Sequence, residues 1–268
     1  VNFEQSIARL GAITRSGDDA LLGLEQTARR LGETTQFSAS EAASAMTFLG
    51  MAGFKTNEII SATPGMLNLA QAAGSDLAGT ADIASNILSG FSLKADEMGR
   101  VGDVLSATFT TSNTTLQMLG DTLKYAAPVA SSAGASIEQV AAMAGLLGNV
   151  GIQGSMAGTA LRAAFLRLSA PPKVAADALA SLGVEVKDLD GNLRSVPELL
   201  QELAQATEGL GSAERAEAIK QIFGSEASAG LTELLKQAGS GALDSYIQQL
   251  QQAKGTADTM AKKMSATT

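Results

Sequence analysis

Residues 136–161 read SIEQVAAMAGLLGNVGIQGSMAGTAL, and this stretch decides the fold class. Ser136 and Gln139 have the spacing of a capping box, in which a hydroxyl accepts from a backbone N–H and the residue three positions later reciprocates. Apolar residues then recur at helical spacing: Ile137, Val140, Ala141, Ala144 and Leu147. This narrow stripe of small side chains predicts an amphipathic helix that packs closely against a neighbouring helix.

The same signals recur on both sides of that stretch. Further capping boxes are predicted at Ser38–Glu41, Thr114–Gln117 and Ser195–Glu198, and simpler caps at Thr56 and Ser75. From Ser38 to about Lys94 the predicted starts recur every 18 or 19 residues, the length of one helix and its turn. This regularity indicates consecutive helical hairpins and is typical of descent from a repeat.

One segment departs from the helical pattern. Residues 183–194 read GVEVKDLDGNLR, in which valine alternates with charged residues before an Asp-Gly turn. The pattern predicts one small β-hairpin near 184–194, after which Pro197 opens the next helix. Asp188, Asp190 and Asn192 alternate as in a calcium loop, but such a loop needs more oxygen ligands and a terminal Glu. We therefore predict a turn and no metal site.

Together these patterns predict an all-α fold of stacked short helical hairpins with that single β-hairpin. Residues 1–35 are expected to form a helical lead-in and residues 36–170 a helical-hairpin domain. A smaller domain with the hairpin is expected at 171–240, and at 241–268 a C-terminal helix that leads toward a region outside this chain. The 28 glycines and the aromatic content of 4% require a core of small side chains, with methionines such as Met46 and Met156 as gap-fillers.

The composition argues against several classes of function. With no Cys and no His, the chain has no thiolate nucleophile, imidazole base, disulfide or zinc site of the usual kind. The net charge of −8 argues against sequence-specific binding of nucleic acid, which depends on clustered Lys and Arg. Glu33 and Glu41, the carboxylates considered for a muralytic site, are better explained as a solvated helix end and a cap. We predict a protein that is not an enzyme, with no catalytic residue and no cofactor.

A glycine run lies between Lys124 and Arg162, where Glu138 is the single charged residue. We predict helix packing or an interaction surface at these positions, with Arg162 closing the segment: Gly145, Gly148, Gly151, Gly154, Gly158 and Arg162. Two interpretations stay open. The glycines form a turn between two buried helices, or the uncharged stretch 139–161 crosses a bilayer.

Several phrases of the sequence resemble the phage minor tail, or tape measure, family. The stretch begins with LGETTQFSASEAA at 31–43 and continues through LKYAAPVA at 123–130. It is sharpest in GIQGSMAGTALR at 151–162 and ends with IFG at 222–224. The order of these phrases, over roughly residues 28–240, carries the resemblance.

The resemblance implies a structural protein packed in the lumen of a growing tail tube. Such a protein sets tail length during assembly and is released ahead of the DNA at ejection. It implies tail tube proteins, tail-tip (baseplate) proteins, tail assembly chaperones and self-association as partners. The implied location is the virion, in the tail lumen or tip, after synthesis in the host cytoplasm. The alternative is a membrane-active conduit for DNA across the host inner membrane, which would use 139–161.

This chain departs from the family's expected long rod, because its pattern is one of compact hairpins. We therefore assign the ruler itself to parts of the protein outside this chain.

Overall fold

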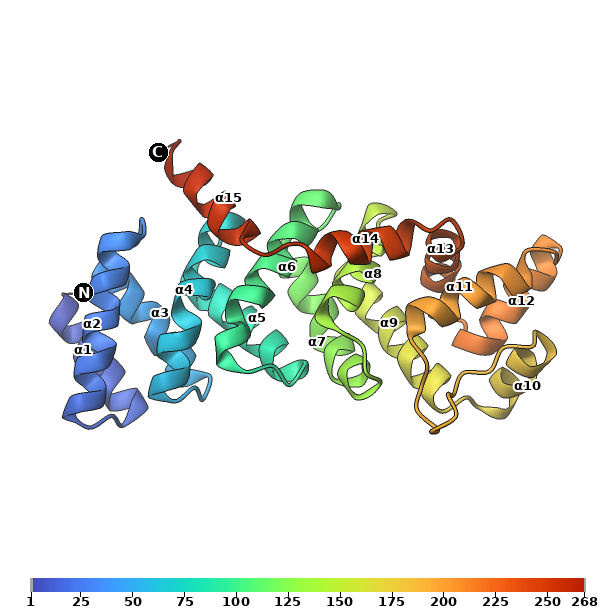
Figure 1. Cartoon of the computed structure of the whole chain (residues 1–268), viewed down its shortest axis with the longest axis horizontal. Coiled ribbons are helices and arrows are strands. Elements are labelled where there is room, and N and C mark those ends of the chain that lie inside the picture. Colours follow the sequence, from blue (N-terminus) through green and yellow to red (C-terminus); the bar gives the residue numbers. More distant parts are fainter. Residues whose placement is uncertain (1, 268) are drawn as a thin grey trace. The chain divides into compact units, whose positions relative to one another are not determined.

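The computed structural model describes residues 2–267, and these fold into helices joined by short turns (Figure 1). The all-α prediction is confirmed, and no strand occurs between residues 2 and 267. The elements are α1 (Phe3–Thr14), α2 (Asp18–Thr34), α3 (Ala39–Met51), α4 (Thr56–Ala73), α5 (Leu77–Gly90), the 3-10 helix η1 (Ala95–Glu97), α6 (Met98–Thr111), α7 (Leu116–Ser132), α8 (Ile137–Asn149), α9 (Gly154–Ser169), α10 (Lys173–Ser181), α11 (Val196–Thr207), α12 (Ser212–Phe223), α13 (Ser228–Gly239), α14 (Ala242–Gln251) and α15 (Thr256–Ser265).

The chain divides into two compact units. Unit 1 contains the helices up to Ala107 together with the stretch from Ala253, and unit 2 runs from Thr108 to Gln252. The four segments expected from the sequence, with boundaries after residues 35, 170 and 240, stay a prediction.

Unit 1 is built from successive antiparallel helices that contact their second neighbours as well as their first. α3 packs on α1, α2, α4 and α5, and α15 packs on α4. The start of α3 is the predicted capping box, in which Ser38 N donates to Glu41 Oε2 at 2.7 Å and Glu41 N donates to Ser38 Oγ at 3.2 Å. The fully buried side chains include Leu10, Leu24, Met46, Leu49, Ile59 and Met66.

Only some of the predicted caps have the predicted form. The box at Ser136 and Gln139 is present, with Gln139 N donating to Ser136 Oγ at 3.2 Å. The others differ because an adjacent residue occupies the cap: Thr115 in place of Thr114, Asp76 in place of Ser75, and Lys55 in place of Thr56. Ser195 is the N-cap residue of α11, but its side chain makes no cap hydrogen bond, so the predicted box at Ser195–Glu198 is absent.

Unit 2 is centred on α7, α9, α11 and α13. α7 packs on α9 and α11 on α13, while α14 covers α8. Two arginines bind the carbonyl ends of helices, where the helix dipole is negative. Arg167 Nε donates to Ile222 O at 2.7 Å, and Arg215 Nε donates to Thr207 O at 3.1 Å.

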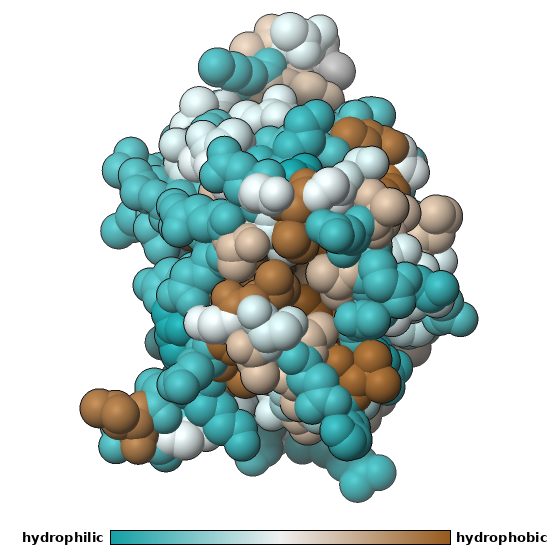
Figure 2. Space-filling view, turned by 90° about the vertical axis from the view of Figure 1, so that its right-hand side faces the viewer, coloured by the Kyte–Doolittle hydropathy of each residue, from teal (hydrophilic) through white to brown (hydrophobic). Residues whose placement is uncertain are grey.

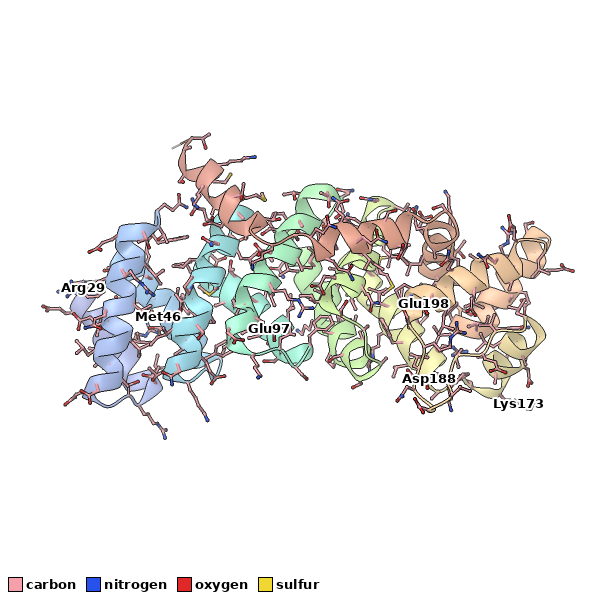
Figure 3. All side chains as sticks on the ribbon, in the orientation of Figure 1. Arg29, Met46, Glu97, Lys173, Asp188 and Glu198 are labelled. Carbon is pink, nitrogen blue, oxygen red and sulfur yellow. The ribbon has the colours of Figure 1, made fainter. Side chains whose placement is uncertain are left out.

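The predicted β-hairpin near 184–194 is wrong. This loop has one isolated antiparallel bridge, between Lys187 and Leu193, and no ladder. Asp188 Oδ1 accepts from the backbone N–H groups of Asp190 and Asn192, at 3.0 and 2.9 Å. Figure 3 shows Asp188 in this loop, which leads to α11.

Two physical reasons explain why no hairpin forms. The carbonyl of Glu185 accepts a hydrogen bond from Arg194 Nη1 at 2.8 Å. The side chain of Arg194 thus occupies a backbone acceptor that a strand pair could have used. Val184 is buried, whereas Leu189 at the tip is fully exposed, so the alternation does not build one apolar face. A two-stranded ribbon with no apolar face and no third strand is only marginally stable.

The Arg194–Glu202 ion pair gives unit 2 a dependence on pH. The hydrogen bond from Arg194 lowers the pKa of Glu202, and the same bond raises the pKa of Arg194. Because the folded state holds the Glu202 proton less tightly than the unfolded state, the pair stabilises the fold above the unfolded pKa of about 4.3. This stabilisation is lost as the pH falls through the lower folded pKa.

We expect Glu202→Gln to lower the free energy of unfolding at pH 7 by a small amount, because the pair is partly solvated. The difference from the unmodified chain should shrink toward zero as the pH falls below about 4. Urea unfolding at a series of pH values measures it, with Glu208→Gln, an exposed glutamate directly after the end of α11, as the control. A difference that stays constant down to pH 3 would contradict this assignment.

Candidate interaction surface

The uncharged stretch 139–161 folds as two helices joined by a turn. α8 ends at Asn149 and α9 begins at Gly154. In the turn, Ile152 N donates to Leu147 O at 3.0 Å, and Gly151 has φ +82°, a conformation that favours glycine. Within residues 2–267, no helix combines the length and the apolar character needed to cross a membrane.

Two glycines of α8 bring its backbone against other parts of unit 2. A Cβ on Gly145 would lie 2.9 Å from Tyr246 Cε1, and a Cβ on Gly148 would lie 2.4 Å from Thr114 Cγ2. Tyr246 itself is held by a 2.7 Å hydrogen bond between its Oη and Thr111 Oγ1. Because any larger side chain would separate these elements, both positions are points of close packing.

Polar side chains join the turn after α8 to the turn before α7. Asn113 N donates to Asn149 Oδ1 at 2.8 Å, and Gln153 Nε2 donates to Asn113 O at 2.7 Å. Gln153 Nε2 also lies 3.3 Å from Gly148 O, at the carbonyl end of α8. These bonds satisfy backbone groups at the helix ends and hold the α8–α9 turn in one conformation.

The closest helix contact of this region is that of α9 with α7. A Cβ on Gly158 would lie 2.8 Å from Thr122 O and 2.9 Å from Tyr125 Cβ. Thr122 Oγ1 also donates to Gly154 O at 2.9 Å, across the same contact. Gly154 has φ +57°, and Arg162 points from the exposed face of α9. Gly145, Gly148 and Gly158 thus lie at packing contacts, whereas their role in binding a partner, with that of Arg162, stays a prediction.

Apolar side chains line the outside of the α8–α9 turn. Met156 is 65% exposed and Val150 is 49% exposed. A shallow groove of about 250 Å³ runs beside Met156, between the start of α9 and α13, and it is lined by Ile152, Ser155, Met156, Thr159, Ala160, Glu226, Ala229 and Gly230. We call this groove together with Val150 the α8–α9 surface.

Sequence reasoning missed the outward role of Met156. Met46 is buried as a core gap-filler, but Met156 and Met51 are exposed. The missed signal is position: Met156 lies in the first turn of its helix, two residues after Gly154, on the side opposite to the buried Ala157 and Gly158. An exposed thioether beside a groove suits an adaptable apolar contact.

A second apolar groove lies at the end of unit 2 that carries α10. Figure 2 shows apolar residues gathered in the middle of the face at that end, surrounded by hydrophilic ones. The groove has a volume of about 470 Å³ and is lined by Pro171, Ala176, Leu179, Ala180, Gly183, Val184, Glu185, Val186 and Lys187. The loop that follows it presents Leu189 to solvent.

The acidic side chains of residues 2–267 form no group of three or more that is arranged to hold a metal ion. Asp188 and Asp190, considered above as part of a calcium loop, are adjacent in a turn in which Asp188 binds backbone N–H groups. The exposed apolar side chains of the two grooves are suited to contact with apolar groups of another macromolecule.

Comparison with known proteins gives two kinds of match. The model of the family described as phage-related minor tail protein matches residues 25–224. A tape measure protein of Pneumococcus phage Dp-1 is 36% identical over 262 residues, which are 98% of this chain and 23% of that protein. A probable tape measure protein of Escherichia phage P2 is 40% identical over 246 residues, which are 90% of this chain and 30% of that protein. No solved structure matches the chain.

Proposed function

Because the chain belongs to the phage-related minor tail protein family, we propose that it is the helical segment of a tail tape measure protein. Its role is structural: the whole protein is packed in the tail tube lumen, sets tail length during assembly and leaves ahead of the DNA at ejection. The observation that carries this proposal is the identity of 36% and 40% to two tape measure proteins over nearly the whole chain. The proposal assigns no catalytic step to the chain.

The matched part is a minor fraction of each relative. The chain spans 23% of one curated relative and 30% of the other. Short helical hairpins span little distance per residue, because a helix rises only about 1.5 Å per residue and the chain reverses direction at each turn. We therefore assign the ruler to other parts of the protein, and to this segment an assembly contact inside the tail.

The proposed partners are proteins of the tail: tube proteins, tail-tip or baseplate proteins, tail assembly chaperones and further copies of the protein. The proposed location is the virion, in the tail lumen or at the tip. The α8–α9 surface is our candidate for one of these contacts, because it places exposed apolar groups on a turn that hydrogen bonds hold rigid. Rigid presentation reduces the entropy lost on binding.

Met156→Glu tests the contact in the phage or prophage that encodes the chain. Glutamate in the first turn of α9 is compatible with the helix, so folding is retained. A buried charge in the contact weakens binding by about tenfold or more, the effect of roughly 1.4 kcal/mol. We expect the yield of complete tails, counted by electron microscopy of lysates, to fall by a similar factor.

The matched control is Met51→Glu, which changes a methionine with 62% exposure in unit 1. This control should leave the yield of tails unchanged. Equal yields for both variants would reject the α8–α9 surface as an assembly contact while leaving the proposed function standing. The proposed function itself is rejected if mass spectrometry finds no peptide of residues 2–267 in the tails of purified virions that have not yet ejected their DNA.

A further inference from the structure

We propose that α15 is a detachable strap of unit 1, which closes over α4 and α6 and releases while the rest of the unit stays folded. The chain leaves unit 1 at Ala107 and returns to it at Ala253, so the whole of unit 2 separates α15 from the rest of unit 1 along the sequence. Figure 1 shows α15, in red, at α4, on which it packs. The inference concerns the mechanics of unit 1 and does not depend on the proposed function.

The apolar attachment of α15 is a single narrow stripe. Ala253, Ala257 and Ala261 are spaced by four residues and are the buried positions from residue 253 to residue 267. Ala257 and Ala261 lie on one face of α15, and Ala253 lies in the turn that precedes the helix. Their small side chains permit close approach: a Cβ on Gly102 would lie 3.9 Å from Ala257 Cβ. The buried side chains of this attachment are alanines, so they bury less apolar area than the Ile, Leu and Met side chains that α4 places in the core.

Two polar residues of unit 1 supply the rest of the attachment. Asp103 on α6 caps the start of α15, with Oδ2 accepting from Gly255 N and Oδ1 from Ala257 N, each at 2.9 Å. Gln71 on α4 donates from Nε2 to Ala261 O at 2.7 Å, and its side chain is buried. Asp103 is thus the latch: it satisfies N–H groups at the start of α15, where the helix dipole is positive.

The strap opens as a unit because α15 is too short to persist alone. An isolated helix of fewer than about 12 residues is marginal in water, and α15 has 10. When the buried alanines separate from α4, α15 loses the packing that stabilises it. The helix therefore unfolds in the same step in which it detaches. α4, by contrast, keeps its contacts with α3 and α5, so its inner amides stay protected.

Hydrogen exchange of the whole chain under native conditions tests the proposal. We expect the amides of residues 257–265 to exchange by a local opening, faster than those of α4. Asp103→Ala removes the latch and should speed this exchange by about tenfold, while α3 and α4 keep their rates. Asp96→Ala, which removes an exposed carboxylate at η1, is the control and should leave α15 unchanged.

A disulfide lock gives an independent test in the same protein. The chain has no cysteine, and the 3.9 Å distance between the Gly102 and Ala257 Cβ positions falls in the range for disulfides, about 3.5–4.5 Å. Gly102→Cys with Ala257→Cys should slow the exchange of α15 by tenfold or more when oxidised, with the reduced form as its own control. Two results would overturn the strap. One is an equal exchange rate of the α15 amides in the oxidised and reduced forms. The other is that the α15 amides exchange at the same rate as those of α4, in one common opening.

Discussion

Replacing Phe165 by alanine is expected to lower the free energy of unfolding by about 3–5 kcal/mol, the largest loss among the substitutions considered. Phe165 is 1% exposed and is among the largest fully buried side chains of unit 2. Its removal forfeits the transfer free energy of the ring and leaves a cavity, because the helices around it can collapse only in part. Urea denaturation followed by circular dichroism measures the loss.

The adjacent Leu166→Ala is the matched control for this change. Leu166 lies on the same helix and is 46% exposed, so its truncation should cost less than about 1 kcal/mol. A comparable loss for the two variants would show that α9 does not bury the face that contains Phe165.

Gly158→Ala is expected to destabilise unit 2 by about 2 kcal/mol, although alanine is the better helix former by roughly 1 kcal/mol. The added Cβ would lie 2.8 Å from the carbonyl oxygen of Thr122, which is backbone and cannot turn aside. α7 and α9 must therefore separate, and the packing along the whole contact loosens. Thermal and urea unfolding of the variant measure the effect.

The same substitution at Gly99, in the first turn of α6, should have the opposite sign. A Cβ there meets nothing within 4 Å, so Gly99→Ala should gain about 0.5–1 kcal/mol from backbone entropy alone. If Gly158→Ala also stabilises the protein, the close approach of α9 to α7 is not required, and glycine at 158 has another cause.

Local features of the chain predicted the helices well. The capping boxes at Ser38 and Ser136 are read from residues three apart, and a cap forms within the segment that carries it. Where prediction was wrong by one residue, as at Thr114, two adjacent hydroxyl side chains offered equivalent caps. The choice of Thr115 depends on the fold, because Thr114 packs against α8 beside Gly148.

The β-hairpin shows how a local pattern misleads. Alternation in residues 184–194 predicts strands only if one face is buried by a neighbour. In the fold, Arg194 binds the carbonyl of Glu185 and the carboxylate of Glu202, and Asp188 holds the turn with its own side chain. Only the contact with Glu202 involves α11, and the sequence of the loop alone contained no sign of that one.

The sequence by itself determined that this protein is helical, has a core of small side chains and carries no imidazole or thiol chemistry, because composition, periodicity and caps act within one turn of the chain. Only the tertiary structure decided which faces are covered. In the fold, the glycines between 145 and 158 lie either at close helix contacts or in or next to the α8–α9 turn, and Met156 is exposed. It also decided that α15 returns to α4 across 190 residues, from Gln71 to Ala261. The physical reason is that a side chain is buried only when a second surface covers it. The spacing of apolar residues along one helix shows which face is covered but not which element covers it.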